Sequence, residues 1–351
     1  MKQQVDYLIV GQGLAGSCLA LELAKRKASF LVIDHLAPNS ASRVAAGLFN
    51  PITGKTLQYT WRATEFFPFM IEFYKQAQHD LGNVFLHEMP ILRPFISEAE
   101  YNQWKTNNHP FVSGVNKDEY WQTFIQHHYG FLELNHCGYL DTDSFLSSVR
   151  IKIKEQNCLQ ESVFSFADLN AAQSTYQNIP FNHLIFCEGV AANTNPYFKW
   201  TPIKKLKGET MLIETELPTN VIFNRGVFAV PTHESNRFLV GSTYAHDETS
   251  GNTEAGLSEL KKKAEQLFKK GFKIISTNWG HRPTTPDRRP VLGRHPNHKN
   301  LLIFNGLGTK GVSLAPFFAV QLASYLDGKM DLDLAVNIER FYSLSFQNQG
   351  S

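Results

Sequence analysis

A glycine-rich turn near the N-terminus has the residue types and spacing of a phosphate-binding loop. A short apolar run leads into Gly11, Gly13 and Gly16, and apolar residues at helical spacing begin at Leu14. Such a turn between a strand and a helix presents backbone N–H groups and the positive end of a helix dipole to a pyrophosphate. The next apolar run ends at Asp34, whose carboxylate is placed to accept hydrogen bonds from ribose hydroxyls and disfavours a 2′-phosphate. These features predict a dinucleotide site in a β-α-β unit.

A second motif lies near the C-terminus. Residues 280–293 follow the spacing Gly-x-Arg-Pro-x-x-x-Asp-x-x-Pro-x-x-Gly, which resembles the signature of the D-amino-acid oxidase family of FAD enzymes. Residues 41–51, 207–209, 240–243 and 300–316 are similar, in family order, to its early flavin loop, two substrate-domain strands and its final strand, flavin loop and helix. The resemblance implies an α/β fold (α+β overall), with a Rossmann-like FAD-binding domain and an inserted, mainly antiparallel-sheet substrate domain.

Changes of pattern along the chain divide it between these two expected domains. The chain has 351 residues, of which 42% are hydrophobic, so it can bury a large core in about two domains. We expect a discontinuous FAD-binding domain of residues 1–55, 138–200 and 276–351. Residues 56–137 and 201–275 are then the substrate domain.

The resemblance implies roles for four candidate catalytic residues. Arg282 is expected to bind a substrate carboxylate, because a planar guanidinium suits a bidentate pair. Lys310 is expected beside the flavin pyrimidine, where its charge favours the anionic reduced ring. Tyr244 and His281 are expected to line the pocket. The residues alone leave other roles open: Arg282 can pair with Asp287 or a backbone carbonyl, Lys310 can be a solvated lysine, and the two rings can be satisfied by the backbone.

The resemblance also implies which residues surround the cofactor. Gly306, Gly308 and Gly311 are expected to give backbone donors to flavin O2. The full set of expected cofactor-binding residues is Gly11, Gly13, Leu14, Ala15, Gly16, Asp34, Ser42, Arg43, Ala46, Gly47, Val163, Gly189, Gly280, Arg282, Gly306, Leu307, Gly308, Thr309, Lys310 and Gly311.

Some positions depart from the family pattern. Glu188 stands where the family usually has a small residue before the glycine, which puts a negative charge near the cofactor. Arg43 replaces a small or amide residue in the early flavin loop. Thr284 and Thr285 occupy the late position at which some relatives attach the flavin covalently. We therefore expect FAD to be bound non-covalently.

These assignments predict a FAD-dependent oxidoreductase. It would oxidise the C–N bond of a small amino acid or secondary amine, of the glycine, sarcosine or D-amino-acid type, by hydride transfer to flavin N5, with O2 or another group as electron acceptor. One alternative is an oxidase acting on a carboxymethylaminomethyl group of a modified tRNA uridine, because the flavin loop also resembles that branch. Another is a non-catalytic flavin-binding protein, against which the presence of Arg282 and Lys310 argues.

Composition bears on the partners. A formal charge of +2 gives no concentrated positive field, so tRNA is an alternative partner that we do not favour. The lysines at 261–263 are expected on a solvated helix face. The four cysteines form no Cys-x-x-Cys pair, which fits a reducing cytoplasm, and no apolar run reaches the ~20 residues of a membrane span.

Four histidines are candidate metal ligands by residue type. His127, His128, His295 and His298 have no carboxylate or cysteine cluster at ligand spacing. We therefore expect surface histidines and no metal site.

Overall fold

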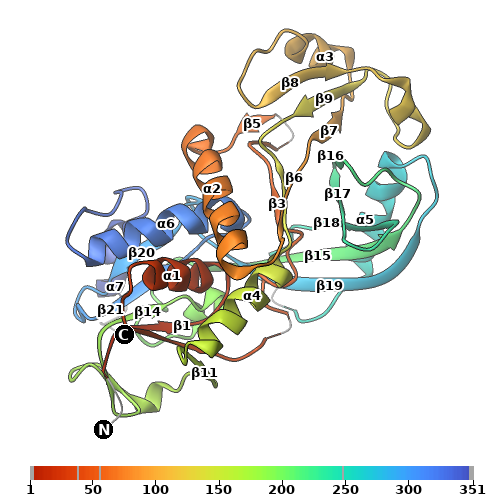
Figure 1. Cartoon of the computed structure of the whole chain (residues 1–351). Helices are drawn as coiled ribbons and strands as arrows, with labels where there is room; N and C mark the ends of the chain where they lie inside the picture. The colour runs from red at the N-terminus through yellow and green to blue at the C-terminus, as the bar shows by residue number, and fades with distance from the viewer. Residues whose placement is uncertain (1–3, 38, 55–56, 247–248, 348–351) are drawn as a thin grey trace.

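Two eight-stranded sheets dominate the structure, a computed structural model that describes residues 4–37, 39–54, 57–246 and 249–347. In Figure 1 the first sheet lies at the lower left, and the second extends to the right and top. Successive segments of the chain alternate between the two sheets. Each part is therefore discontinuous in sequence.

The first sheet has a core of five parallel strands in the order β11, β2, β1, β14 and β21. Their bounds are Leu159–Glu161 (β11), Phe30–Asp34 (β2), Val5–Val10 (β1), Ile179–Phe186 (β14) and Leu301–Asn305 (β21). Antiparallel strands are added at β21 and β14: Val291–Arg294 (β20), Leu169–Asn170 (β12) and Thr175–Tyr176 (β13). The parallel order brings the carboxyl ends of the core strands to one edge, where open α/β sheets bind ligands.

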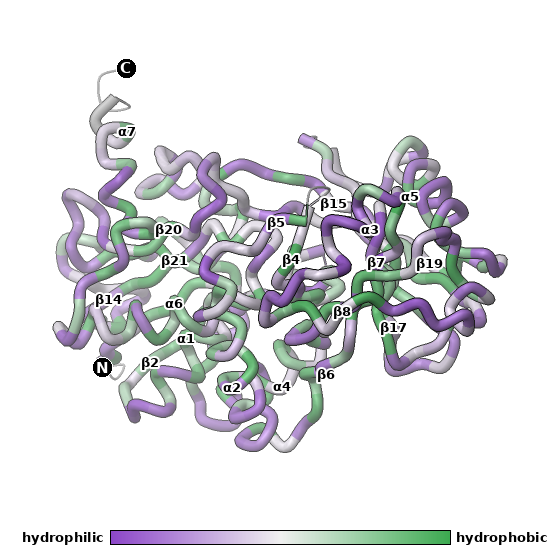
Figure 2. Tube along the Cα trace, turned by 90° about the horizontal axis from the view of Figure 1, so that it is seen from above, coloured by the Kyte–Doolittle hydropathy of each residue, from purple (hydrophilic) through white to green (hydrophobic). Residues whose placement is uncertain are grey.

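Helices α1 (Leu14–Lys25), α4 (Thr142–Glu155) and α6 (Gly311–Leu326) cover one face of this sheet. Side chains of a strand alternate between faces, so Ile9 of β1 packs under these helices while Leu8 packs on the other side. Hydrophobic residues gather on α1, α6 and the strands near them (Figure 2). The sheet is thus buried on both faces, as a parallel sheet requires.

The second sheet has the order β19, β15, β18, β17, β16, β7, β9 and β8, and only the β16–β7 pair is parallel. The bounds are Lys273–Thr284 (β19), Lys204–Glu214 (β15), Arg237–Gly241 (β18), Val227–Pro231 (β17), Ile222–Arg225 (β16), Ile91–Pro94 (β7), Phe131–Leu134 (β9) and Val112–Asn116 (β8). Helix α5 (Glu254–Leu267) packs on one face over Met211 and Ile213. The other face shares a core with the first part through Ile91, Leu134 and Val230.

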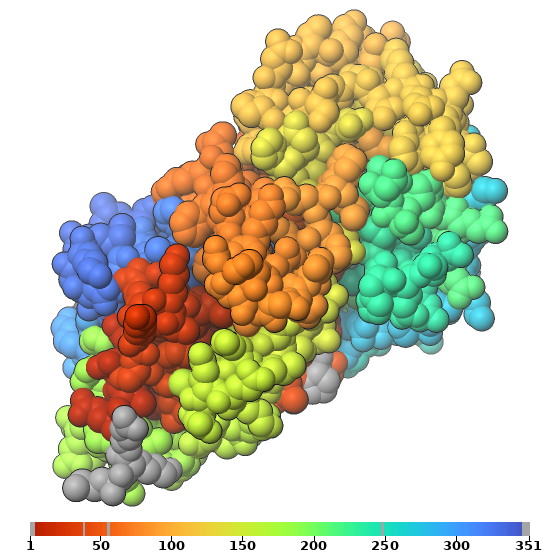
Figure 3. Space-filling model, viewed as in Figure 1, coloured from red at the N-terminus to blue at the C-terminus, as the bar shows by residue number. Residues whose placement is uncertain are grey.

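Helix α2 (Ala63–Leu81) belongs to the segment that we expected in the substrate domain, yet it packs along α6. The Tyr74 hydroxyl donates a hydrogen bond to the Val312 carbonyl over 3.1 Å. On the face shown in Figure 3, the orange residues of α2 lie between the red N-terminal residues and the green residues of the second sheet. The sequence pattern predicts an amphipathic stretch over about residues 61–78 that is interrupted at Pro68, but the helix continues through this residue. Pro68 lies in its second turn and removes a single intrahelical hydrogen bond.

Packing also crosses the other expected boundaries. β19 runs unbroken through the boundary at 275/276 as the edge of the second sheet. A small sheet joins β3 (Leu48–Phe49), β10 (Gly138–Leu140) and β6 (Leu86–Glu88). The remaining short elements are β4 (Ile52–Thr53), β5 (Gln58–Tyr59), α3 (Glu98–Trp104), η1 (Glu119–Thr123), η2 (Phe166–Asp168), η3 (Gly189–Asn193), η4 (Ile338–Phe341) and α7 (Tyr342–Gln347).

One predicted strand is wrong. The sequence pattern over residues 162–166 predicts a strand there, but β11 ends at Glu161. Its only ladder is with β2, and Glu161 already pairs with Asp34, the last residue of that strand. The ladder has no partner beyond this point.

Over the described part of the chain, no helix has the length and apolar character needed to cross a membrane.

Helix α4 begins at an aspartate cap, which yields a stability prediction. The Asp141 carboxylate accepts hydrogen bonds from the Ser144 backbone N–H (3.0 Å) and hydroxyl (2.7 Å). The sequence allows either Asp141 or Thr142 to cap this helix, but Thr142 lies inside it and donates to the Ala45 carbonyl. Asp141→Ala should therefore lower the free energy of unfolding by about 1 kcal/mol, measured by denaturant titration. An unchanged transition midpoint would contradict the cap.

Candidate active site

The glycine-rich turn packs tightly at the carboxyl ends of β1 and β14. Gly11 has a φ of +97°, and a Cβ on it would lie 2.6 Å from the Cys187 carbonyl oxygen. A Cβ on Gly16 would lie 1.9 Å from the Gly11 carbonyl oxygen. Side chains at either position would push α1 away from the strands. The two glycines therefore hold the start of α1 at the sheet edge.

Two side chains from the next segment contact this turn. Asp34 accepts a hydrogen bond from the Gln12 backbone N–H at 2.9 Å. The Ser42 hydroxyl accepts one from the Leu14 backbone N–H at 3.1 Å. The N-cap residue Gly13 has no side chain to cap α1, so Ser42 takes one of the N–H groups of the first turn that lack an intrahelical partner. The structure thus gathers the expected acid and the early loop around one helix N-terminus.

The other expected residues of the first part lie along the same edge. Gly47 has a φ of +63° and its carbonyl accepts from the Leu140 N–H, which ties the loop that also contains Ala46 to β10. Arg43 pairs with Asp143 at the start of α4, at 2.6 Å. Val163 follows β11 and is 66% exposed, so the edge is open to solvent there.

The glycines before α6 require a correction. The Gly306 N–H donates to the Asn305 side-chain oxygen at 2.8 Å, and the Gly308 N–H donates to the Pro283 carbonyl at 2.9 Å. These two N–H groups are therefore not available as the expected donors to flavin O2. Gly311 begins α6, so its N–H belongs to the unpaired first turn of a helix. Gly308, with a φ of +55°, still allows the loop to turn closely under Pro283.

Glu188 lies at the end of β14 beside the glycine-rich turn. Its Cα is 3.3 Å from where a Cβ of Gly11 would be. Its carboxylate accepts from the Asn195 amide at 2.6 Å. Burial raises the pKa of the Glu188 carboxyl to about 7. Burial therefore favours the protonated, neutral carboxyl, which opposes the negative charge that we expected there.

Arg282 lies on β19, on the face of the second sheet opposite helix α5, which we call the inner face. In the β15–β19 ladder Leu206 pairs with Arg282 and Gly208 with Gly280, so these four residues share a face. A Cβ on Gly208 would lie 2.1 to 2.3 Å from the terminal nitrogens and central carbon of the guanidinium. Near-equal distances to three atoms of the group mean that the guanidinium lies flat on the Gly208 backbone. Only glycine leaves room for it.

A bulge after β18, the strand on the other side of β15, brings Tyr244 over the same guanidinium. Gly241 of β18 pairs with Thr210 of β15, and Ala245 pairs with Lys207 of the same strand. Four residue steps after β18 therefore lie opposite three steps on β15, which leaves one extra residue. The extra residue shifts Tyr244 opposite Gly208 and reverses the face onto which its side chain points. The Tyr244 ring, 66% exposed, lies 5.1 Å from the Arg282 guanidinium carbon.

His281 does not share this face, which corrects its expected place in the pocket with Arg282. It pairs with Lys207 in the ladder, and its ring lies 5.4 Å from that of Trp279. Successive side chains of a strand point to opposite faces, so His281 and Arg282 cannot line one pocket while β19 remains a regular strand.

The immediate partners of Arg282 are neutral. The guanidinium donates to the Ser242 hydroxyl at 2.8 Å and to the Thr243 carbonyl at 3.4 Å. The suggested partner Asp287 instead pairs with Arg340 at 2.9 Å. Burial lowers the pKa of Arg282. Among the described residues no carboxylate contacts it, so the site holds a partly buried cation with N–H groups left for an anion.

Lys310 is the residue before α6 and contacts the loop between β5 and α2. Its ammonium nitrogen is 3.5 Å from the Thr60 hydroxyl, which in turn donates to the Asn50 carbonyl. Burial lowers the pKa of Lys310 to about 8. Since Gly308 is bonded to Pro283, the Lys310 loop and Arg282 are held on adjoining segments.

Residues that we did not single out also shape the site. Gly208 and Ser242 contact the Arg282 guanidinium, and together they form what we call the Arg282 seat. Their position beside Arg282 follows from the strand register and not from the spacing of residues in the sequence. Arg150 of α4 contacts Asp34 at 2.8 Å. A sequence signal exists for Arg150: it falls between Leu146, Val149 and Ile153 on the apolar face of its helix, where a charged residue needs a buried partner.

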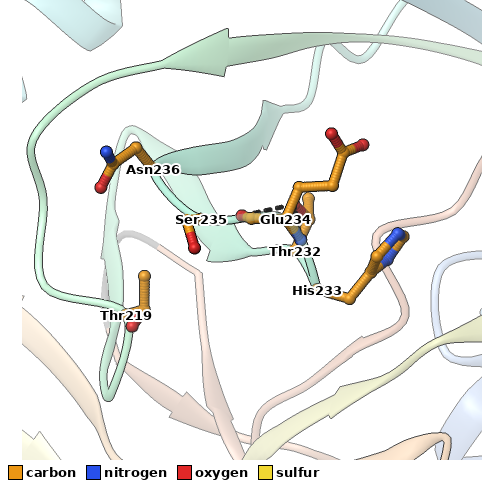
Figure 4. A pocket seen from close by; sticks show the side chains of 6 residues that line it. All are labelled: Thr219, Thr232, His233, Glu234, Ser235 and Asn236. Carbon is orange, nitrogen blue, oxygen red and sulfur yellow. Dashed lines mark hydrogen bonds between the residues drawn. The ribbon is translucent and has the colours of Figure 1, made fainter.

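Two surface hollows differ in their relation to this site. One, lined by Leu36, Arg43, Val44, Asp143 and Asn278, opens beside the Ser42 loop. The other, shown in Figure 4, lies at the turn between β17 and β18, and mostly exposed polar side chains line it. That turn is at the opposite end of β18 from Ser242. It carries none of the candidate residues.

Histidine placement needs one correction. His295 is 7% exposed rather than on the surface, because its ring packs against Phe198 and Trp200. Burial lowers its pKa to about 4. Over the described ranges, no three potential ligands among His, Cys, Asp and Glu come together as a metal site.

Several curated proteins are similar in sequence to this chain. The chain is 24% identical over 377 residues to the bifunctional protein ThiO/ThiG of Trichormus variabilis, covering 99% of the chain and 56% of that protein. It is 23% identical to a glycine oxidase of Bacillus licheniformis over 93% of the chain and 94% of the oxidase. A shorter match, 28% identical over 37% of the chain and 22% of the relative, is to the tRNA 5-methylaminomethyl-2-thiouridine biosynthesis bifunctional protein MnmC of Idiomarina loihiensis. The chain thus spans about half of the first relative's length.

The fold has close counterparts among solved structures. Glycine oxidase from Geobacillus kaustophilus superposes with a TM-score of 0.78 at 21% identity, covering 95% of this chain and 97% of the oxidase. The family model described as FAD dependent oxidoreductase (DAO) matches residues 6–325, nearly the whole chain. This chain is therefore a member of the DAO family of FAD-dependent oxidoreductases.

Proposed function

We propose that this chain oxidises the C–N bond of a small amino acid or secondary amine that carries a carboxylate. The observation that supports it most is the Arg282 seat. Its guanidinium lies flat on Gly208, donates only to neutral groups and has free N–H groups on the inner face. A carboxylate is the ligand that such a planar donor group binds best.

The first part of the chain has the features that FAD needs. The N-terminus of α1 meets the Ser42 loop and offers N–H groups to a pyrophosphate, and Asp34 retains lone pairs for ribose hydroxyls. A Cβ on Gly189 would meet no atom within 4 Å, which leaves space beside β14. We assign these residues, with the loop 306–311, to the cofactor. The site offers no histidine or cysteine for a covalent link at Thr284 or Thr285, so non-covalent FAD is proposed.

Bound FAD supplies the hydride acceptor for the C–H bond beside the amine, and the imine product then takes up water and splits into a carbonyl compound and an amine or ammonia. The chain's part is to orient and to stabilise charge. Arg282 fixes the carboxylate, and the Tyr244 ring restricts its movement above the guanidinium. Lys310 places a positive charge beside the cofactor loop. An amine that binds neutral needs no general base.

The electron acceptor, partner and location belong to the same proposal. We propose O2 or another small acceptor and a cytoplasmic protein. The match to MnmC favours one second candidate, oxidation of a carboxymethylaminomethyl group on tRNA, which needs the same carboxylate seat. Binding of tRNA would weaken steeply with salt, whereas binding of a free amino acid would not.

The visible spectrum of the holoenzyme under anaerobic conditions tests the proposal. Glycine, sarcosine, D-amino acids, proline and a tRNA containing carboxymethylaminomethyl-uridine are added in turn. The proposal predicts that one of the free amines bleaches the flavin band. Bleaching by the tRNA alone would favour the second candidate. A flavin band that no carboxylate-bearing amine reduces would contradict the proposal.

Removal of the guanidinium should impair substrate binding selectively. Arg282→Ala should raise KM for the amine by roughly 30-fold or more, because it removes a charged partner of the carboxylate. FAD should stay bound. Steady-state kinetics with the control Arg288→Ala, an exposed neighbour on the same segment, measures the effect. An unchanged KM would remove Arg282 from the substrate site.

A side chain at Gly208 should displace the Arg282 guanidinium and so weaken substrate binding. Gly208→Ala puts a methyl group where the guanidinium lies, so Arg282 must shift. We expect KM to rise by about 10-fold or more, with FAD affinity unchanged. Gly271→Ala is the matched control, because a Cβ there meets nothing within 4 Å. Equal kinetics for the two variants would show that the seat does not position Arg282.

Lys310 should tune the flavin potential. Lys310→Met should lower it by roughly 30 mV, since a positive charge stabilises the reduced, anionic ring. The pKa of Lys310 is about 8, so its charge is present below pH 8 and is lost as the pH rises through that value. The difference between the two proteins should shrink above pH 8 in spectroelectrochemical titrations. Equal potentials at pH 7 would place Lys310 away from the flavin.

A further inference from the structure

A nearly buried arginine on α4 has no role in the mechanism above. Arg150 is 8% exposed and lies on the apolar face of its helix. A buried guanidinium needs several acceptors, because its desolvation is strongly unfavourable. The identity of those acceptors indicates what Arg150 does.

The Arg150 fork contacts three segments at the carboxyl edge of the first sheet. One terminal nitrogen donates to the Asp34 carboxylate at 2.8 Å and to the Gln12 side-chain oxygen at 3.1 Å. The other terminal nitrogen donates to Glu161 at 3.0 Å. These acceptors come from the end of β2, the glycine-rich turn and the end of β11. Arg150 therefore joins the three segments that surround the expected adenosine end of the cofactor.

These contacts fix the orientation of the Asp34 carboxylate. One of its oxygens accepts from the Gln12 N–H at 2.9 Å and the other from Arg150. A carboxylate offers about four acceptor positions, so two remain for a ligand. Because both oxygens are anchored, the remaining lone pairs point in set directions.

We propose that Arg150 is a positioning residue for the adenosine end of FAD, acting through Asp34 and Gln12 without touching the cofactor. The proposal rests on the assignment of Asp34 to the ribose. A planar fork suits this task better than an ammonium, since it reaches Asp34, Gln12 and Glu161 in one plane. Helix α4 follows the inserted residues 56–137, so the adenosine site is complete only after the chain returns from them.

The matched control lies on the same helix. Lys154 also contacts Glu161, at 2.7 Å, but is exposed and has no contact with Asp34. Lys154→Met thus removes a contact of Glu161 but leaves the contact between Arg150 and Asp34 unchanged.

A double-mutant cycle on FAD affinity tests the proposal without any measurement of activity. FAD-depleted protein is titrated with FAD, and flavin fluorescence gives Kd. Arg150→Met and Asp34→Asn should each raise Kd by about 10- to 100-fold, the range expected for hydrogen bonds to charged groups. The double variant should be little weaker than the weaker single variant, because both changes break one chain of contacts. Lys154→Met should bind as the unchanged protein does, and ADP, which has only the adenosine end, should lose affinity in parallel with FAD.

Several results would overturn the proposal. Wild-type FAD affinity in Arg150→Met, or two effects that multiply in the double variant, would show that Arg150 has a structural role only. If Arg150→Met fails to fold, Arg150→Lys keeps the charge and loses the fork, and it must still weaken FAD and ADP. Unchanged affinity in Asp34→Asn would refute the ribose assignment on which the proposal depends, whereas absence of FAD binding by the unaltered chain would refute the proposed function itself.

Discussion

The function proposed for this chain depends on one guanidinium, that of Arg282, for which the described residues supply no carboxylate partner. Arg282 donates to Ser242 and Thr243 and rests on Gly208, and all of these groups are neutral. A cation in such surroundings is stabilised when an anionic ligand arrives, because the ligand replaces the lost solvation. The one-residue bulge after Gly241 and the glycine on β15 are the structural means: one brings Tyr244 to the right face and the other makes room. In the proposed function, the second sheet positions this guanidinium for a substrate carboxylate.

In the first part of the chain, the glycine-rich turn leaves the backbone open to close approach by the proposed dinucleotide. Gly11 and Gly16 let α1 start directly at the ends of β1 and β14, and Asp34 is anchored from two sides. The two parts are connected physically as well as by sequence. The hydrogen bond from the Gly308 N–H to the Pro283 carbonyl ties the loop before α6 to the residue next to Arg282. Cofactor and substrate segments are therefore held in a fixed relation.

Short-range pattern was enough to predict the β-α-β unit and the glycine-rich turn, because strand, turn and helix follow one another there. The family was predicted from its resemblance in motifs spread along the chain, chiefly residues 280–293 and 300–316. Register was not predictable. His281 and Arg282 are neighbours in sequence, yet strand alternation separates them, and the bulge that turns Tyr244 inward depends on pairing between distant segments. The N–H groups of Gly306 and Gly308 bond within the protein, which a glycine pattern cannot reveal. Arg150 was detectable as a charge on an apolar helix face, but its partners come from other segments of the chain.

Arg282 is proposed to bind the substrate carboxylate, and ligand binding in the absence of turnover is a direct test of this assignment. A simple carboxylate that lacks an amine, such as acetate or glycolate, is titrated into the holoenzyme while the flavin absorbance is recorded. The account predicts a saturable spectral change in the unaltered protein that is lost in Arg282→Met, with the flavin still bound. An equal change in both proteins, or none in either, would contradict the claim that this arginine is the carboxylate site.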